Sequence, residues 1–123
     1  MEVVLDTSFI ISCIKRKIPF IQRLFEMGFN RIGVPRRVMQ ELKDLRTRSP
    51  RAEKEAIEIA LRILEDNDSI KSVHIPSDNV DRGLVLKGKE GVYIATLDKE
   101  IKRNVSNRVV IRDATNSIEI ERD

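Results

Sequence analysis

The alternation of short apolar runs with helical segments is the feature that most limits how this chain can fold. Short runs rich in β-branched residues are typical of strands buried on both faces of a sheet, and periodic apolar positions between them are typical of amphipathic helices. Strands are predicted at residues 3–5, 31–34, 70–75, 92–95, 108–111 and, at an edge, 117–121. Helices are predicted at residues 8–16, 20–28, 35–45, 50–65, 78–89 and 99–105. This order predicts an α/β fold, a three-layer α/β/α sandwich with a central, mostly parallel sheet.

The size and composition of the chain narrow the functional classes. A length of 123 residues predicts a single domain spanning 1–123. The chain has no Trp and one Tyr, which argues against a binding face of stacked aromatic rings. Cys13 is the only cysteine, so no internal disulfide can form, and a reducing, cytoplasmic compartment is expected. Neither a signal peptide nor a membrane-spanning segment is expected, because the first strand follows Met1 and Glu2 directly and no apolar run is long enough.

The charge balance is mildly basic. The chain has 23 Lys and Arg residues against 20 Asp and Glu residues, for a net charge of +3. If a bound cation neutralises a few acids at one site, the rest of the surface carries a larger positive excess. Such a surface attracts a polyanion around a local acidic centre.

Two acids directly follow predicted strands. Asp6 comes after the run at 3–5, and Asp98 lies just past the run at 92–95. Ligands of open parallel sheets bind beyond the carboxyl ends of the strands, so we expect both carboxylates at one edge. Each acid also has a simpler interpretation as the N-cap of the helix that follows it.

Two further acids lie on helices whose first turns reach the same edge. Helical periodicity places Glu41 on the inward side of the 35–45 helix and Asp81 inside the apolar arc of the 78–89 helix. A carboxylate that faces a core needs a compensating partner. Asp78 competes with Asp81 for this role and is interpreted as a helix-start acid.

The compensating partner of these acids is either a basic side chain or a cation. Glu41 could pair with Arg37 or Arg48, and Asp81 with a basic residue of a neighbouring element. A hard divalent cation, Mg²⁺ or Mn²⁺, would compensate all four acids at once. With one histidine, His74, and one cysteine, the chain has no thiol and imidazole set for zinc.

Three sequence blocks resemble those of PIN domains. They read Val-Leu-Asp-Thr-Ser-Phe at 4–9, Val-Pro followed by Val-Met-Gln-Glu-Leu within 34–42, and Ile-Ala-Thr-Leu-Asp-Lys-Glu-Ile at 94–101. The region of Asp81 resembles the remaining acidic position of the family. The chain is most similar to small archaeal relatives of the PIN endonucleases that process ribosomal RNA, and VapC-type toxins share the same blocks.

The resemblance implies a metal-dependent endoribonuclease that cleaves single-stranded RNA with a metal-activated water. It implies that Mg²⁺ or Mn²⁺ binds at Asp6, Glu41, Asp81 and Asp98, with Thr7, Ser8 and Thr96 as accessory polar groups. It further implies a homodimer and, if the protein is a toxin, an antitoxin partner.

Two positions depart from the family pattern. Arg82 stands where relatives often have a second acid, and Leu97 where they often have Asn. These departures support the alternative of a non-catalytic PIN module that binds RNA or serves as a scaffold.

Basic residues near the predicted acidic edge are candidate phosphate contacts. Arg36, Arg37 and Lys99 are favoured because they begin helices at the edge where the acids are expected. The simpler interpretation of such residues is a solvated charged face.

Overall fold

The structure is a computed structural model that describes residues 1–123. Its strands are β1 (Glu2–Leu5), β2 (Arg31–Pro35), β3 (Ile70–Val73), β4 (Tyr93–Ala95), β5 (Asn107–Arg112) and β6 (Ser117–Arg122). Its helices are α1 (Thr7–Lys15), α2 (Phe20–Glu26), α3 (Arg36–Arg48), α4 (Arg51–Asp66), α5 (Val80–Lys89) and α6 (Lys99–Asn104). Every predicted strand and helix is therefore present, with shifted ends.

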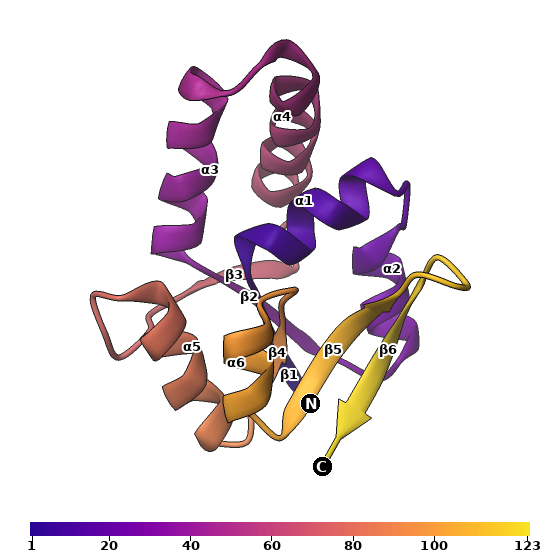
Figure 1. Ribbon diagram of the computed structural model, residues 1–123, viewed down its shortest axis with the longest axis vertical. Helices are drawn as coiled ribbons and strands as arrows, with labels where there is room; N and C mark the ends of the chain where they lie inside the picture. Colours follow the sequence, from indigo (N-terminus) through magenta and orange to yellow (C-terminus); the bar gives the residue numbers. More distant parts are fainter.

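All strands join one sheet in the order β3-β2-β1-β4-β5-β6. The first five strands are parallel, and β6 pairs antiparallel with β5 at the edge. Figure 1 shows α3 beside α4 and, in another part of the molecule, α5 beside α6. The predicted α/β fold with a mostly parallel central sheet is confirmed.

Successive residues of the central strands pack on opposite faces of the sheet, as strand geometry requires. Val3 belongs to the larger core, which contains buried side chains of α1 to α4. Val4 and Ile94 belong to a smaller core with Leu84 of α5 and Ile101 of α6. Helices therefore cover both faces, and this explains why the strands are continuously apolar.

Helix α3 is longer than predicted. Residues 46–48, which lie beyond the predicted end of the helix at residue 45, form its last turn, where the Thr47 hydroxyl donates to the Asp44 carbonyl oxygen (2.8 Å). No residue of this turn breaks a helix. The helix ends at Ser49, whose backbone is extended (ψ 155°) because it precedes Pro50.

Helix α5 begins at Val80, two residues later than predicted. Asn79 is its N-cap, because the Asn79 side chain accepts a hydrogen bond from the backbone N–H of Arg82 (3.0 Å). Asp78 therefore lies outside the helix, and its interpretation as a helix-start acid is wrong.

Two glycines of α5 allow the helix to pack closely. A Cβ atom on Gly83 would lie 2.8 Å from Ile75 Cδ1, and one on Gly88 would lie 2.4 Å from Val105 Cγ1. Both distances are too short for carbon atoms in contact. The two glycines are thus positions at which α5 touches its neighbours.

The buried face of α4 is rotated relative to the predicted one. The apolar spacing of the sequence predicts one buried face made of Ala56, Ile59, Ala60, Ile63 and Leu64. The structure buries Ala56, Ala60 and Leu64 of these, adds Ile57 and Leu61, and leaves Ile59 49% exposed. The difference arises because α4 packs against both α1 and α3, and periodicity alone does not fix the direction of that contact. No helix in the structure has the length and hydrophobicity needed to cross a bilayer.

Candidate active site

Asp6 links the end of β1 to the start of α1. Its backbone N–H donates to the Ala95 carbonyl oxygen (2.9 Å), and its Oδ1 accepts from the Thr7 N–H (2.9 Å). The carboxyl group is the N-cap of α1, so the capping interpretation is correct for Asp6, and the helix begins at Thr7, one residue earlier than predicted. Asp6 is only 8% exposed. The hydrogen bonds to Ala95 of β4 and from Thr7 of α1 together fix its position at the sheet edge.

Thr96 and Ser8 connect Asp6 to the loop that follows β4. The Thr96 hydroxyl donates to Asp6 Oδ2 (2.7 Å) and accepts from the Asp98 N–H (3.1 Å). The Ser8 hydroxyl donates to the same Oδ2 (3.5 Å) and accepts from the Leu97 N–H (3.2 Å). Thr96 is fully buried and acts as a positioning residue behind Asp6.

Asp98 is the N-cap of α6. Its Oδ1 accepts hydrogen bonds from the backbone N–H groups of Glu100 (2.8 Å) and Ile101 (3.2 Å). Its Oδ2 accepts no hydrogen bond from the protein. The capping interpretation is therefore correct for Asp98, and it leaves one carboxylate oxygen free for another role.

Glu41 and Asp81 both reach the predicted edge, but they do not face the core. Both residues are exposed, and the prediction that they point inward is wrong. Helix α3 buries Val38 and Leu42, and α5 buries Leu84, so the two acids stand at the solvated border of each apolar face. Neither carboxylate forms a hydrogen bond or an ion pair, and the alternative of pairing with basic side chains is wrong as well.

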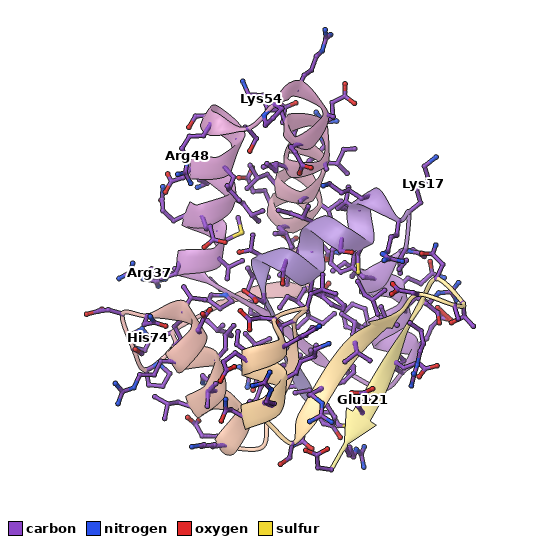
Figure 2. All side chains as sticks on the ribbon, in the orientation of Figure 1. Lys17, Arg37, Arg48, Lys54, His74 and Glu121 are labelled. Carbon is purple, nitrogen blue, oxygen red and sulfur yellow. The ribbon has the colours of Figure 1, made fainter.

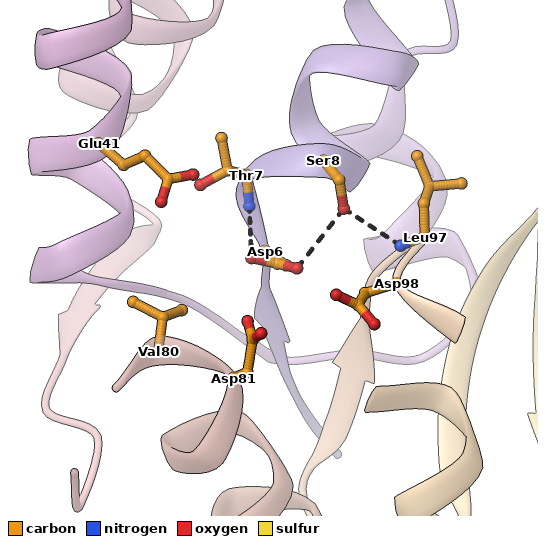
Figure 3. A pocket seen from close by; sticks show the side chains of 8 residues that line it. All are labelled: Asp6, Thr7, Ser8, Glu41, Val80, Asp81, Leu97 and Asp98. Carbon is orange, nitrogen blue, oxygen red and sulfur yellow. Dashed lines mark hydrogen bonds between the residues drawn. The ribbon is translucent and has the colours of Figure 1, made fainter. Parts of the chain in front are cut away.

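These four acids line one cavity of about 410 Å³ at the carboxyl ends of β1 and β4. Figure 3 shows the carboxylates of Glu41, Asp81 and Asp98 approaching Asp6 from three different elements. The complete lining is Asp6, Thr7, Ser8, Glu41, Val80, Asp81, Leu97 and Asp98. The structure therefore brings the four predicted acids to one cavity, and Val80, which the sequence analysis does not single out, is an apolar wall beside Leu97.

The electrostatics of the cavity are unfavourable to a charged Asp6. Burial raises the pKa of Asp6 above its ordinary value, and the negative charges of Asp81 and Glu41 raise it further. The hydrogen bonds from Thr96 and Thr7 lower this pKa but do not cancel the effect of burial. A positive charge in the cavity would relieve the repulsion.

The donor atoms of the cavity fit a hard divalent cation. They are carboxylate and hydroxyl oxygens, the ligands that Mg²⁺ and Mn²⁺ prefer. The Thr7 hydroxyl is buried without any hydrogen-bond partner, so this polar atom is available to a ligand or a water. As the side chains stand, no three His, Cys, Asp or Glu residues form a group that could hold one ion. Glu41 and Asp81 have no hydrogen-bond or ion-pair partner that holds their carboxylates in place.

The three predicted RNA contacts lie outside this cavity. Arg36 and Arg37 begin α3 and line a neighbouring cavity of about 350 Å³. Lys99 begins α6 and lines a third cavity on the side of β5 and β6. The helix starts are thus at the predicted edge, on two sides of the acids. Arg37 Nη2 lies 3.7 Å from Asp78 Oδ1 instead of pairing with Glu41.

The two departures from the family pattern have different surroundings. Leu97 is half-buried and lines the acidic cavity, where its side chain offers no oxygen ligand. Arg82 is exposed and lines a separate cavity between α5 and α6. Its guanidinium group is therefore not part of the lining of the acidic cavity.

Comparisons with known proteins agree with this architecture. A family model described as "PIN like domain" matches residues 3–112. The fold is similar to the solved structure of the PIN domain endonuclease Utp24, with a TM-score of 0.77 and 22% sequence identity over 99% of this chain and 92% of that chain. A search of curated proteins gave no match.

Proposed function

Because the chain belongs to the PIN-like domain family, we propose that it is an endoribonuclease that cleaves single-stranded RNA with the aid of Mg²⁺ or Mn²⁺. One observation carries this proposal. Carboxylates from four elements line a single cavity, and none of them is neutralised by a basic side chain. The buried Asp6 carboxylate is disfavoured beside the negative charges of Asp81 and Glu41 unless a cation compensates them.

Each acid has a distinct part in the proposed reaction. Asp6 is the fixed ligand, because Thr7 and Thr96 hold its two oxygens. Glu41 and Asp81 are adjustable ligands, and Asp98 offers the oxygen that does not cap α6. The chemistry that a bound cation supplies is a lower pKa for the attacking water and neutralisation of charge on the phosphate.

Basic side chains on both sides of the acidic cavity would hold the RNA backbone. Arg36 and Arg37 lie on the α3 side, and Lys99 lies on the α6 side. Contacts of this type position the strand and carry little sequence information. The single buried cysteine, Cys13, is consistent with a cytoplasmic protein.

The decisive experiment compares wild type with Asp6→Asn on a fluorescent single-stranded RNA, in Mg²⁺, Mn²⁺ or EDTA. We expect wild type to cut only with a divalent cation and Asp6→Asn to lose at least about 10²-fold in rate, as expected when a group that supports transition-state charge is removed. Asp68→Asn is the matched control, because Asp68 is exposed and remote from the cavity. Equal cleavage by wild type and Asp6→Asn would disprove the proposal. So would the absence of cleavage by wild type at a protein concentration well above that of any contaminant.

A non-catalytic RNA-binding module is the second candidate, favoured by the apolar side chain of Leu97 in the cavity wall. It predicts RNA binding that survives loss of the acids, with no cleavage by wild type.

Within the nuclease class, the two candidate roles are a processing enzyme and a toxin with an antitoxin partner. A neighbouring reading frame for a small DNA-binding antitoxin favours the toxin, and a native mass measurement tests the expected homodimer.

A further inference from the structure

A second cavity adjoins the acidic one at the start of α3. Its volume is about 350 Å³, and it lies between the first turns of α3 and the segment that follows β3. Arg37 at the start of α3 and His74 after β3 both line it, and Figure 2 shows the two residues on the same side of the molecule. Gln40 completes its polar side, and Val73 and Ile75 form an apolar wall.

We propose that this cavity is a nucleotide subsite, which binds the phosphate and the base of an RNA nucleotide next to the bond that is cleaved. The inference rests on the proposed function, because it places the RNA across the acidic cavity. It goes further by assigning the binding of one nucleotide to named residues.

The arginines provide the phosphate-binding part of the subsite. Arg36 forms no ion pair or side-chain hydrogen bond, and Arg37 forms only the 3.7 Å contact with Asp78. Both partners of this contact are open to water, with side chains 56% and 107% exposed. An exposed pair of this length is weak, so a phosphate can replace Asp78 as the partner of Arg37.

The other groups of the cavity suit a base. Val73 and Ile75 offer the apolar contact that the face of a base requires, and the His74 ring offers both contact and hydrogen bonding. The Gln40 amide nitrogen donates to Asp44 Oδ1 (3.0 Å), which leaves the Gln40 carbonyl oxygen free to accept from a base.

The two other cavities near the acids suit a nucleotide less well. The cavity beside α6 contains Lys99 and Arg108 but no apolar residue, so it suits a phosphate alone. The cavity between α5 and α6 has an apolar wall and one cation, Arg82, but its three acids outnumber that cation and repel a phosphate. The cavity at α3 has two arginines against a single acid, Asp78, beside its hydrogen-bonding groups and apolar wall.

The position of the subsite relative to the acids is set by α3. Arg37 lies four residues before Glu41, so the two side chains project from one face of the helix about 6 Å apart along its axis. Glu41 lines the acidic cavity and Arg37 the second one. This separation places the subsite within reach of a nucleotide adjacent to the reacting phosphate.

The test measures binding of a fluorescent single-stranded oligoribonucleotide by anisotropy as a function of salt. All variants are made in the full chain with Asp6→Asn and are studied without divalent cations, which keeps the RNA intact. We expect Arg37→Gln to reduce the slope of log K against log salt by about 0.7, the value for one phosphate contact. Arg62→Gln, which removes an exposed charge on α4, should leave the slope unchanged.

Two further variants separate the parts of the subsite. Asp78→Asn should strengthen binding by roughly two- to fivefold, because it frees Arg37 without removing a cation. His74→Ala should weaken binding by roughly fivefold, the effect of one hydrogen bond or contact, with no change in salt slope. Circular dichroism spectra identical to that of the parent show that each variant is folded.

The outcomes distinguish this inference from the proposed function. If Arg37→Gln and His74→Ala bind like Arg62→Gln while wild type cleaves RNA and Asp6→Asn does not, the subsite is wrong and the nuclease stands. Weaker binding by Asp78→Asn also overturns the subsite. If the parent binds no RNA, the subsite is wrong, and the cleavage assay with wild type alone decides the proposed function.

Discussion

The Thr96 hydroxyl donates a hydrogen bond to Asp6 Oδ2 (2.7 Å) across a sequence separation of 90 residues. The same hydroxyl oxygen accepts from the backbone N–H of Asp98 (3.1 Å). One buried group therefore fixes the carboxylate at the end of β1 and the start of the loop that carries Asp98. It controls the relative position of two acids without entering the cavity.

Thr96→Val should disturb the site at nearly constant volume. It removes the donor to Asp6 and the acceptor of Asp98, so we expect a loss of about 1–3 kcal/mol in the free energy of unfolding. Urea unfolding measures this loss, and calorimetric titration with Mn²⁺ should show weaker binding. Thr96→Ser keeps the hydroxyl and should recover most of the Mn²⁺ affinity. Equal affinities for the Val and Ser variants would contradict the positioning role.

Asp6 should make the stability of the cation-free protein depend on pH. Burial raises the pKa of Asp6 above the ordinary 3.8, so the folded state holds this proton more tightly than the unfolded chain does. The free energy of unfolding therefore falls as the pH rises from about the pKa of Asp6 in the unfolded chain through its raised pKa in the folded protein. In EDTA, the unfolding midpoint of wild type should fall relative to that of Asp6→Asn over this range. Parallel profiles for the two proteins would show that Asp6 is not the cause.

Leu97→Asn should improve cation binding. The Leu97 side chain lines the acidic cavity, and an amide in its place would add an oxygen ligand without loss of the backbone hydrogen bond to Ser8. We expect Mn²⁺ to bind about tenfold more tightly, the lower end of the effect of one supporting ligand. Leu97→Ala is the control, since it opens the wall without adding oxygen. An equal gain for both variants would point to access and not to ligation.

Gly88→Ala should destabilise the fold although alanine favours helices. The new Cβ would lie 2.4 Å from Val105 Cγ1, and overpacking of this kind costs about 1–3 kcal/mol against a helix-propensity gain of about 1 kcal/mol. Val105→Ala removes the clashing methyl group, so the double variant should be more stable than the sum of the single effects predicts. Strict additivity in urea unfolding would be the contrary result.

Cys13 should not react with thiol reagents in the folded protein. Burial raises the pKa of this thiol to about 12, and the thiolate is the reactive form. Iodoacetamide at pH 8 should therefore leave the native protein unmodified and alkylate it in urea, as mass spectrometry would record. Rapid alkylation without urea would mean that α1 opens readily.

The places of Asp6 and Asp98 could be predicted because both depend on topology. Each acid follows a strand, and parallel strands bring their carboxyl ends to one edge. The edge reached by Glu41 and Asp81 could be predicted as well, since helices of such folds run opposite to the strands. Their burial could not, because periodicity gives a direction around a helix but not the distance to its neighbour.

The second cavity was beyond sequence analysis for a related reason. Part of its lining depends on the backbone path of residues 74–79, which connect β3 to α5. Pro76 and Ser77 indicate a turn but not its direction. Only that direction places His74 in the lining of the same cavity as Arg37.

The strand order also has a consequence for the synthesis of the protein. β1 lies between β2 and β4, so one of its edges stays unpaired until residues 93–95 have been made. Asp6 is synthesised 90 residues before Thr96, which fixes it. The acidic centre of a nascent chain is therefore not assembled until Thr96 has left the ribosome, itself a large RNA-containing machine.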